Sequence, residues 1–174
     1  MSNGYNLDMG TLLTAMKQSL VETTSLSYLN DVRIVNGPWM ADPWNQYTVY
    51  LRPGGSPETL VAESGARGIC KYAVHVVVVE VVMRIENPFD EDSVVGRTDE
   101  RVGITSFVAD LCEFLENNTL GLLSTELEEN VPPTIEFPDG AYQGQIADDD
   151  IWIQSARGIY RARTRPFYRT GTFT

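Results

Sequence analysis

The chain contains little cysteine and histidine, two residue types that often take part in catalysis or bind metals. It has two cysteines, Cys70 and Cys112, and neither belongs to a C-x-x-C pair. Structural zinc sites and redox-active thiol pairs use such spacings, so we expect both thiols to be free. Glycine-rich phosphate-binding patterns are also missing from the sequence, which therefore predicts no nucleotide cofactor.

Histidine occurs once, as His75, within a run of valines. A catalytic histidine needs a nucleophile to activate, and no G-x-S-x-G or similar pattern accompanies this one. We expect His75 to be a packed structural side chain and the protein not to be an enzyme.

Two acidic stretches have some features of a metal site. Asp90 and Asp92 have the spacing of the first ligands in a calcium loop, but Val94 and Val95 follow where a ligand and a glycine are needed. The three aspartates at 148–150 would point apart on an extended chain. The sequence predicts no metal site at either place.

Long apolar runs are scarce, and the longest extends from Tyr72 to Val79. Glu80 ends it well before the roughly 20 residues that a membrane span requires. Its four consecutive valines are typical of a β-strand. Both faces of this strand are apolar, so we expect the protein's own helices to cover one face and something else to cover the other.

The charges are distributed unevenly. The net charge is −11, yet residues 151–174 contain five arginines and no acidic residue. Such an acidic chain does not bind nucleic acid through its general surface. Alternate positions of an expected strand at 156–169 place all five arginines on one face: Arg157, Arg161, Arg163, Arg165 and Arg169. This pattern predicts either a solvated sheet edge or an interface with carboxylates of a partner.

Periodicity predicts a single α+β domain at 1–174, with a mainly antiparallel sheet of four to five strands and two helices packed on one face. We expect one helix at 7–21, capped by Asn6 or Asp8, and a second that begins after Thr98 and ends at Asn117-Asn118. The expected strands cover residues 32–35, 46–53, 71–85 and 151–165, and residues 58–63 are a possible return strand that pairs with 46–53 across a turn.

Two loops have features that suggest contact with other molecules. The segment NGPWMADPWN contains Trp39 and Trp44, which either anchor a partner or fold back onto the core. The stretch 124–150 has eight acidic residues and three prolines, and it is longer than usual loops. We expect it to be a functional excursion or to contain a short hairpin.

The order of elements resembles the tail terminator (tail completion) proteins of tailed bacteriophages. The matching segments are GTLLTAMKQSL, YTVYLRPGGSPETLVAE, YAVHVVVVEVVMRIENP, GITSFVADLCEFLENN and ARGIYRARTRPFY. They cover most of the chain. This family has no diagnostic short motif, so the resemblance rests on the arrangement and length of these segments. The excursion at 124–150 is longer than the family leads us to expect.

The resemblance implies a homo-oligomeric ring, typically a hexamer, at the head-proximal end of the virion tail. Such a ring caps the tail tube protein, ends tail polymerisation and joins the tail to a neck or head-completion protein, while DNA passes through its lumen. It is assembled in the host cytoplasm without contact with a membrane. The residues that we expect at subunit or partner interfaces are Tyr72, Val74, Val76, Val78, Trp39, Trp44 and the five arginines named above.

Two other functions remain open at this point. A neck or head-completion protein of the same virion region would have a similar sequence. A small acidic inhibitor or immunity protein would instead bind one basic partner. Ring formation without a partner favours the virion proteins, whereas a monomer that binds a single basic protein favours the inhibitor.

Overall fold

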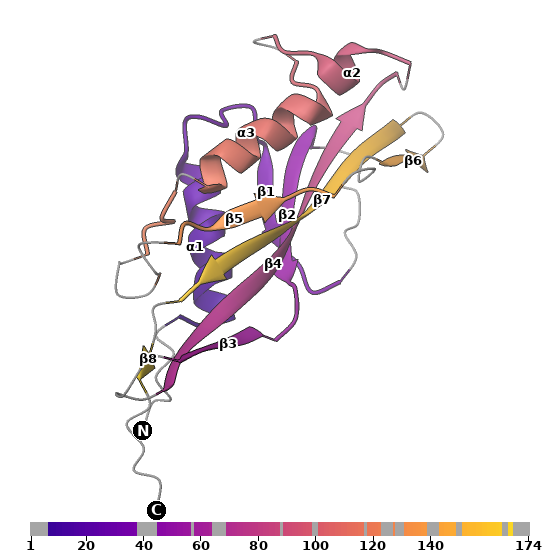
Figure 1. Ribbon diagram of the computed structural model, residues 1–174. Helices are drawn as coiled ribbons and strands as arrows, with labels where there is room; N and C mark the ends of the chain where they lie inside the picture. Colours follow the sequence, from indigo (N-terminus) through magenta and orange to yellow (C-terminus); the bar gives the residue numbers. More distant parts are fainter. Residues whose placement is uncertain are drawn as a thin grey trace, which may run out of the picture.

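The computed structural model has a two-layer α+β fold in which helices pack on one face of a mostly antiparallel sheet (Figure 1). It describes residues 7–37, 45–56, 58–63, 69–87, 89–98, 101–116, 118–122, 127, 131–138, 143–148, 151–164 and 167–168. Only the backbone is described at 58–63, 69–72, 143–148, 151 and 167–168.

The helices are α1 (Met9–Glu22), α2 (Asp92–Val95) and α3 (Ile104–Glu116). The strands are β1 (Asp31–Ile34), β2 (Tyr47–Pro53), β3 (Glu58–Glu63), β4 (Ile69–Ile85), β5 (Thr134–Glu136), β6 (Gln143–Asp148), β7 (Ile151–Arg163) and β8 (Phe167–Tyr168). Five strands follow the order β1-β2-β4-β7-β5, and the other three pair alongside this path. The predicted α+β class is therefore confirmed, and only the β1–β2 pair is parallel among the described strands.

The sheet is organised around β4, a strand of 17 residues. β7 pairs with it antiparallel from Val74 to Ile85, and the short β8 continues along the same edge at Cys70 and Lys71. β2 pairs with the other edge from Val77 to Met83. This strand is therefore hydrogen-bonded on both edges, as its valine-rich sequence favours.

The predicted pairing of 46–53 with 58–63 is wrong. β3 pairs with β4, along the same edge that β2 occupies, so β2 and β3 follow one another instead of lying side by side. The bend between them is at Gly54, whose N–H donates to the Val76 carbonyl at 2.8 Å. A Cβ at Gly54 would lie 2.6 Å from a methyl of Val76, so the chain can bend this close to β4 only with glycine there.

The acidic excursion at 124–150 contributes two strands to the sheet. β5 and β6 both pair antiparallel with β7 of the same chain. The excursion has no hairpin of its own among its described residues, because β5 and β6 pair with β7 and not with each other; β6 instead forms a hairpin with β7, which begins after the excursion. The expected strand at 156–169 is divided, since β7 begins at Ile151 and ends at Arg163 and β8 pairs separately with β4.

Both predicted helices are present, but only the first begins where expected. Asp8 caps α1, because its carboxylate accepts a hydrogen bond from the Thr11 N–H at 2.8 Å. The second helix begins at Ile104 and not after Thr98. Thr98 instead closes a turn with Arg101, because the two residues exchange backbone hydrogen bonds.

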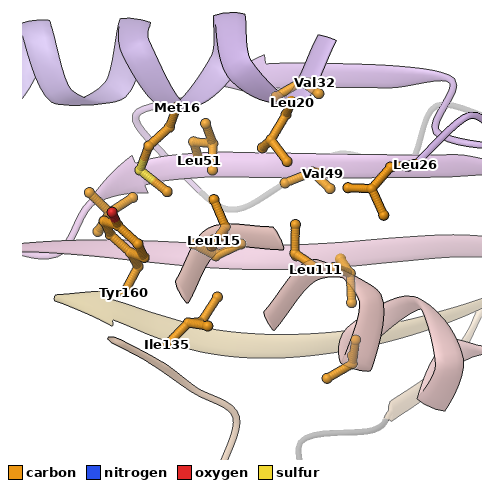
Figure 2. Packing of buried hydrophobic residues seen from close by; sticks show 14 of the residues in the cluster. Met16, Leu20, Leu26, Val32, Val49, Leu51, Leu111, Leu115, Ile135 and Tyr160 are labelled. Carbon is orange, nitrogen blue, oxygen red and sulfur yellow. The ribbon is translucent and has the colours of Figure 1, made fainter. Parts of the chain in front are cut away.

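The core lies between the helices and the sheet. Figure 2 shows Met16 and Leu20 of α1 and Leu111 and Leu115 of α3 directed toward the strands. The strands contribute buried side chains from all along the sheet: Val32, Val49, Leu51, Val77, Val79, Val81, Ile135 and Tyr160. The two helices therefore cover the same face of the sheet, as predicted.

His75 is buried on the helix-covered face of β4, with 2% of its surface exposed. Neither ring nitrogen has a hydrogen-bond partner of good geometry among the described residues. Burial lowers the pKa of His75, and the backbone of Leu7 and the carboxylate of Asp8 only partly oppose this shift. The ring is therefore neutral near pH 7, which fits the predicted packing role.

This burial makes stability depend on pH in a defined direction. The unfolded chain binds a proton at His75 below about pH 6.5, whereas the folded chain binds it only at lower pH. The free energy of unfolding should therefore fall as the pH decreases from about 7.5 to 5.5, by up to about 1.4 kcal/mol per pH unit from this group. Urea unfolding across this range should show a flatter dependence for His75→Gln. If the free energy of unfolding depends on pH in the same way in both proteins, His75 is not a buried group with a lowered pKa.

Candidate protein–protein interface on the helix-free face of the sheet

The two faces of β4 have different surroundings. Val77, Val79 and Val81 point toward the helices and are fully buried. The alternate residues point to the opposite face, which none of the described helices covers and which we call the helix-free face. On this face Val76 and Val78 are only half-buried.

A strip of valines and arginines runs along the middle of the helix-free face. Val78 is paired with Ile159 in the β4–β7 register, and Val76 is paired with Arg161. Arg157 and Arg161 are exposed, and Ile159 is half-buried. We call Val76, Val78, Arg157, Ile159 and Arg161 the valine–arginine strip. Apolar side chains bordered by exposed guanidinium groups are a composition that recurs at protein interfaces.

The structure thus brings several predicted interface residues together. Val74 and Arg163 form the next pair beyond the strip, with Val74 9% exposed and Arg163 half-buried. Tyr72 continues β4, but only its backbone is described. Four other predicted residues lie outside the described residues: Arg165, Arg169, Trp39 and Trp44.

A buried carboxylate lies beside the strip. The side chain of Glu80 is 5% exposed and accepts hydrogen bonds from Arg52 at 3.3 Å and from Arg157 at 3.2 Å. A buried charge of this kind requires partners, and two arginines from the flanking strands supply them. The sequence indicated only that Glu80 interrupts an apolar run. A lone glutamate in a valine-rich strand was the one signal that a buried ion pair would be found there.

One end of the helix-free face is covered by the chain itself. Tyr50, Val82 and Ile153 form a small buried cluster there, and Val35 packs against it. The carbonyl of Gly37 accepts a hydrogen bond from Arg52 at 3.5 Å, which places this loop residue beside the same face. The valine–arginine strip lies farther along β4 and is the more open part.

The helix-free face is positively charged although the chain is acidic. The described side chains on this face include six arginines and three carboxylates, a formal charge of +3. The arginines are Arg33, Arg52, Arg84, Arg157, Arg161 and Arg163, and the carboxylates are Asp31, Glu80 and Glu136. The whole chain carries −11, so the remaining residues together carry −14. The described side chains of this face are therefore net cationic although the whole chain is acidic.

The structure gives no support for a reactive thiol or a metal site at the other positions that the sequence analysis considered. Cys112 is half-buried, and burial raises the pKa of its thiol to about 11, so it is mostly protonated near neutral pH. Asp90 forms an ion pair with Arg101 at 2.9 Å. Within the described residues, no three histidine, cysteine or acidic side chains lie close enough together to hold a metal ion.

Comparisons with known proteins found no family model and no curated protein that matches this chain. Within the part of the chain that the structure describes, no helix has the length and apolar character needed to cross a membrane.

The Glu80 cluster leads to a stability prediction. Glu80→Ala leaves the largely buried guanidinium of Arg52 without its carboxylate, so it should lower the free energy of unfolding by about 3–5 kcal/mol. Arg157→Ala should lower it by about 1 kcal/mol or less, because the Arg157 side chain is 58% exposed and Arg52 still pairs with Glu80. Urea unfolding of the two variants measures this difference. If both variants lose the same free energy of unfolding, Glu80 is not a buried carboxylate on which Arg52 depends.

Proposed function

We propose that this chain is a structural virion protein that forms a ring, hexameric by resemblance to tail terminators, on the end of a bacteriophage tail tube. In this role it ends tail polymerisation and provides the tail-side surface for head-tail joining. The observation that supports the proposal best is the valine–arginine strip, an apolar and cationic surface that none of the described helices covers.

A neighbouring subunit would complete the burial of β4. Val76, Val78 and Ile159 retain exposed apolar surface, and removing such surface from water is favourable by about 25 cal/mol per Å². Contacts between unlike surfaces repeat from copy to copy and generate a closed ring when the rotation closes. Cyclic assembly thus covers the strip of every copy.

The charge distribution supports the same role. The described side chains of the helix-free face carry +3, whereas the whole chain carries −11. If the cationic face is buried at subunit contacts, acidic surface remains exposed on the ring and in its lumen. DNA binds proteins mainly through cationic contacts to its phosphates, so it would pass through such a lumen without being held.

A neck or head-completion protein of the same virion region would use a similar ring, and binding to isolated tail tubes separates the two roles. The inhibitor or immunity role draws support only from the net charge of −11. A protein that masks a basic partner needs an acidic docking surface, whereas the strip exposes Arg157 and Arg161. This feature favours the ring.

Reversing one charge in the strip should weaken assembly. Arg161 is exposed, so Arg161→Glu should leave the fold intact while placing a carboxylate where a cation contacts the neighbouring subunit or the tail tube. We expect light scattering at high protein concentration, and sedimentation with purified tail tubes, to show a loss of about tenfold or more in apparent affinity. Raising the salt concentration should weaken wild-type assembly in the same direction, because exposed charges are screened within about 10 Å at 0.1 M.

Lys17→Glu is the matched control, since Lys17 is an exposed cation on α1, on the other side of the molecule. It makes the same change in net charge and should assemble like the wild type. A wild-type protein that stays monomeric and also fails to bind tail tubes would rule out the proposed function.

A further inference from the structure

The loop between β4 and α3 presents a second apolar surface to solvent. Residues 89–97 include α2, and we call this segment the α2 knob. Three of its apolar side chains are exposed: Phe89 by 91%, Val95 by 63% and Val94 by 37%. Three exposed apolar side chains within seven residues of the sequence mark a candidate interaction site.

The α2 knob is firmly held by the rest of the molecule. Thr105 of α3 donates a hydrogen bond to the Val94 carbonyl at 2.6 Å, and Arg101 forms an ion pair with Asp90 at 2.9 Å. Gly103 packs so closely on the knob that a Cβ there would lie 2.6 Å from the Val94 carbonyl oxygen. A rigid projection loses little conformational entropy when a partner binds it.

The knob and the valine–arginine strip have complementary chemistry. The strip combines half-buried Val76, Val78 and Ile159 with the exposed cations of Arg157 and Arg161. The knob combines its exposed apolar side chains with the exposed carboxylates of Glu91 and Asp92. Apolar surface can therefore meet apolar surface while each carboxylate faces a guanidinium group.

The two surfaces are too far apart to meet within one chain. α2 lies beyond the end of β4, at the opposite end of the molecule from β8 (Figure 1). The knob residues Asp90 and Asp92 line one pocket together with Arg84, and the nearest strip residue, Arg157, is paired with Glu80. At about 3.3 Å per residue, the four residues from Glu80 to Arg84 separate the two surfaces by about 13 Å. A knob that contacts a strip must therefore come from another copy.

From these observations we propose that the α2 knob of one copy docks on the valine–arginine strip of the next copy. The inference rests on the proposed ring and assigns the two surfaces that form its repeating contact. The contact is heterologous, because strip against strip would bring like charges together, and heterologous contacts lead to rings. Each contact is small, so closure of the ring supplies additional stability once all contacts form.

Replacing two exposed apolar side chains of the knob tests this contact. Phe89→Ser with Val95→Ser changes two exposed side chains, so the fold should survive, as circular dichroism would verify. Light scattering should show that the concentration for half-assembly rises by about tenfold or more, since buried aromatic anchors dominate interface energies. Val21→Ser is the control, because Val21 on α1 is 62% exposed and lies outside both surfaces. It should assemble like the wild type.

A charge exchange identifies the two partners. Glu91→Lys on the knob and Arg161→Glu on the strip should each impair assembly alone, because each brings like charges together at every contact. Mixing the two variants in equal amounts should restore assembly, because alternating copies then pair opposite charges throughout an even-numbered ring.

The outcomes separate this contact from the proposed ring. If the Phe89→Ser with Val95→Ser variant assembles like the wild type, or if the mixture does not recover, knob docking is wrong while the ring stands. A wild-type protein that never self-associates, alone or on tail tubes, overturns both.

Discussion

The structure depends on the long strand β4 and on its pairing along both edges. β2 and β3 occupy one edge in succession, and β7 and β8 occupy the other. A strand placed in this way has two faces to cover but no free edge along most of its length. The helices cover one face, and among the described residues only one end of the other face is covered. The partly uncovered face is therefore a direct consequence of the topology.

The composition of that face is unusual for a surface meant only to face water. Its valines continue the apolar pattern of the core-facing side, while three of its six arginines come from β7, which carries no acidic residue. Glu80 lies among the valines of β4 and forms ion pairs with Arg52 of β2 and Arg157 of β7. It therefore connects the apolar residues of this face to its arginines. The carboxylate holds both arginines in place beside the apolar strip. An ordered cationic border around apolar surface suits a defined partner better than solvent alone.

Local periodicity predicted the elements of the fold but not all of their pairings. The spacing of apolar residues placed α1 within two residues at each end, and the valine run identified β4. Pairing partners are not encoded locally, so β3 was assigned to the wrong neighbour. The start of α3 was missed because Thr98 fits a helix cap as well as the turn that it forms.

The sequence predicted which residues of the candidate site share a face of a strand, but not which residues lie next to one another. Alternation along β7 correctly placed Arg157, Arg161 and Arg163 on one face, since side chains alternate strictly in a strand. Their position beside Val76 and Val78 followed only from the β4–β7 register. The exposure of the three apolar side chains of the α2 knob had no signal in the sequence, because three apolar residues in a polar loop are as easily buried as exposed.

The most direct test of the central claim is a structure of the assembled particle by electron cryomicroscopy, prepared with and without tail tubes. The account predicts a closed ring in which the helix-free face of every copy is buried against a neighbouring copy, with Val76 and Val78 inside the contact. A ring in which these valines face solvent or the lumen would contradict it, as would particles that contain only single copies.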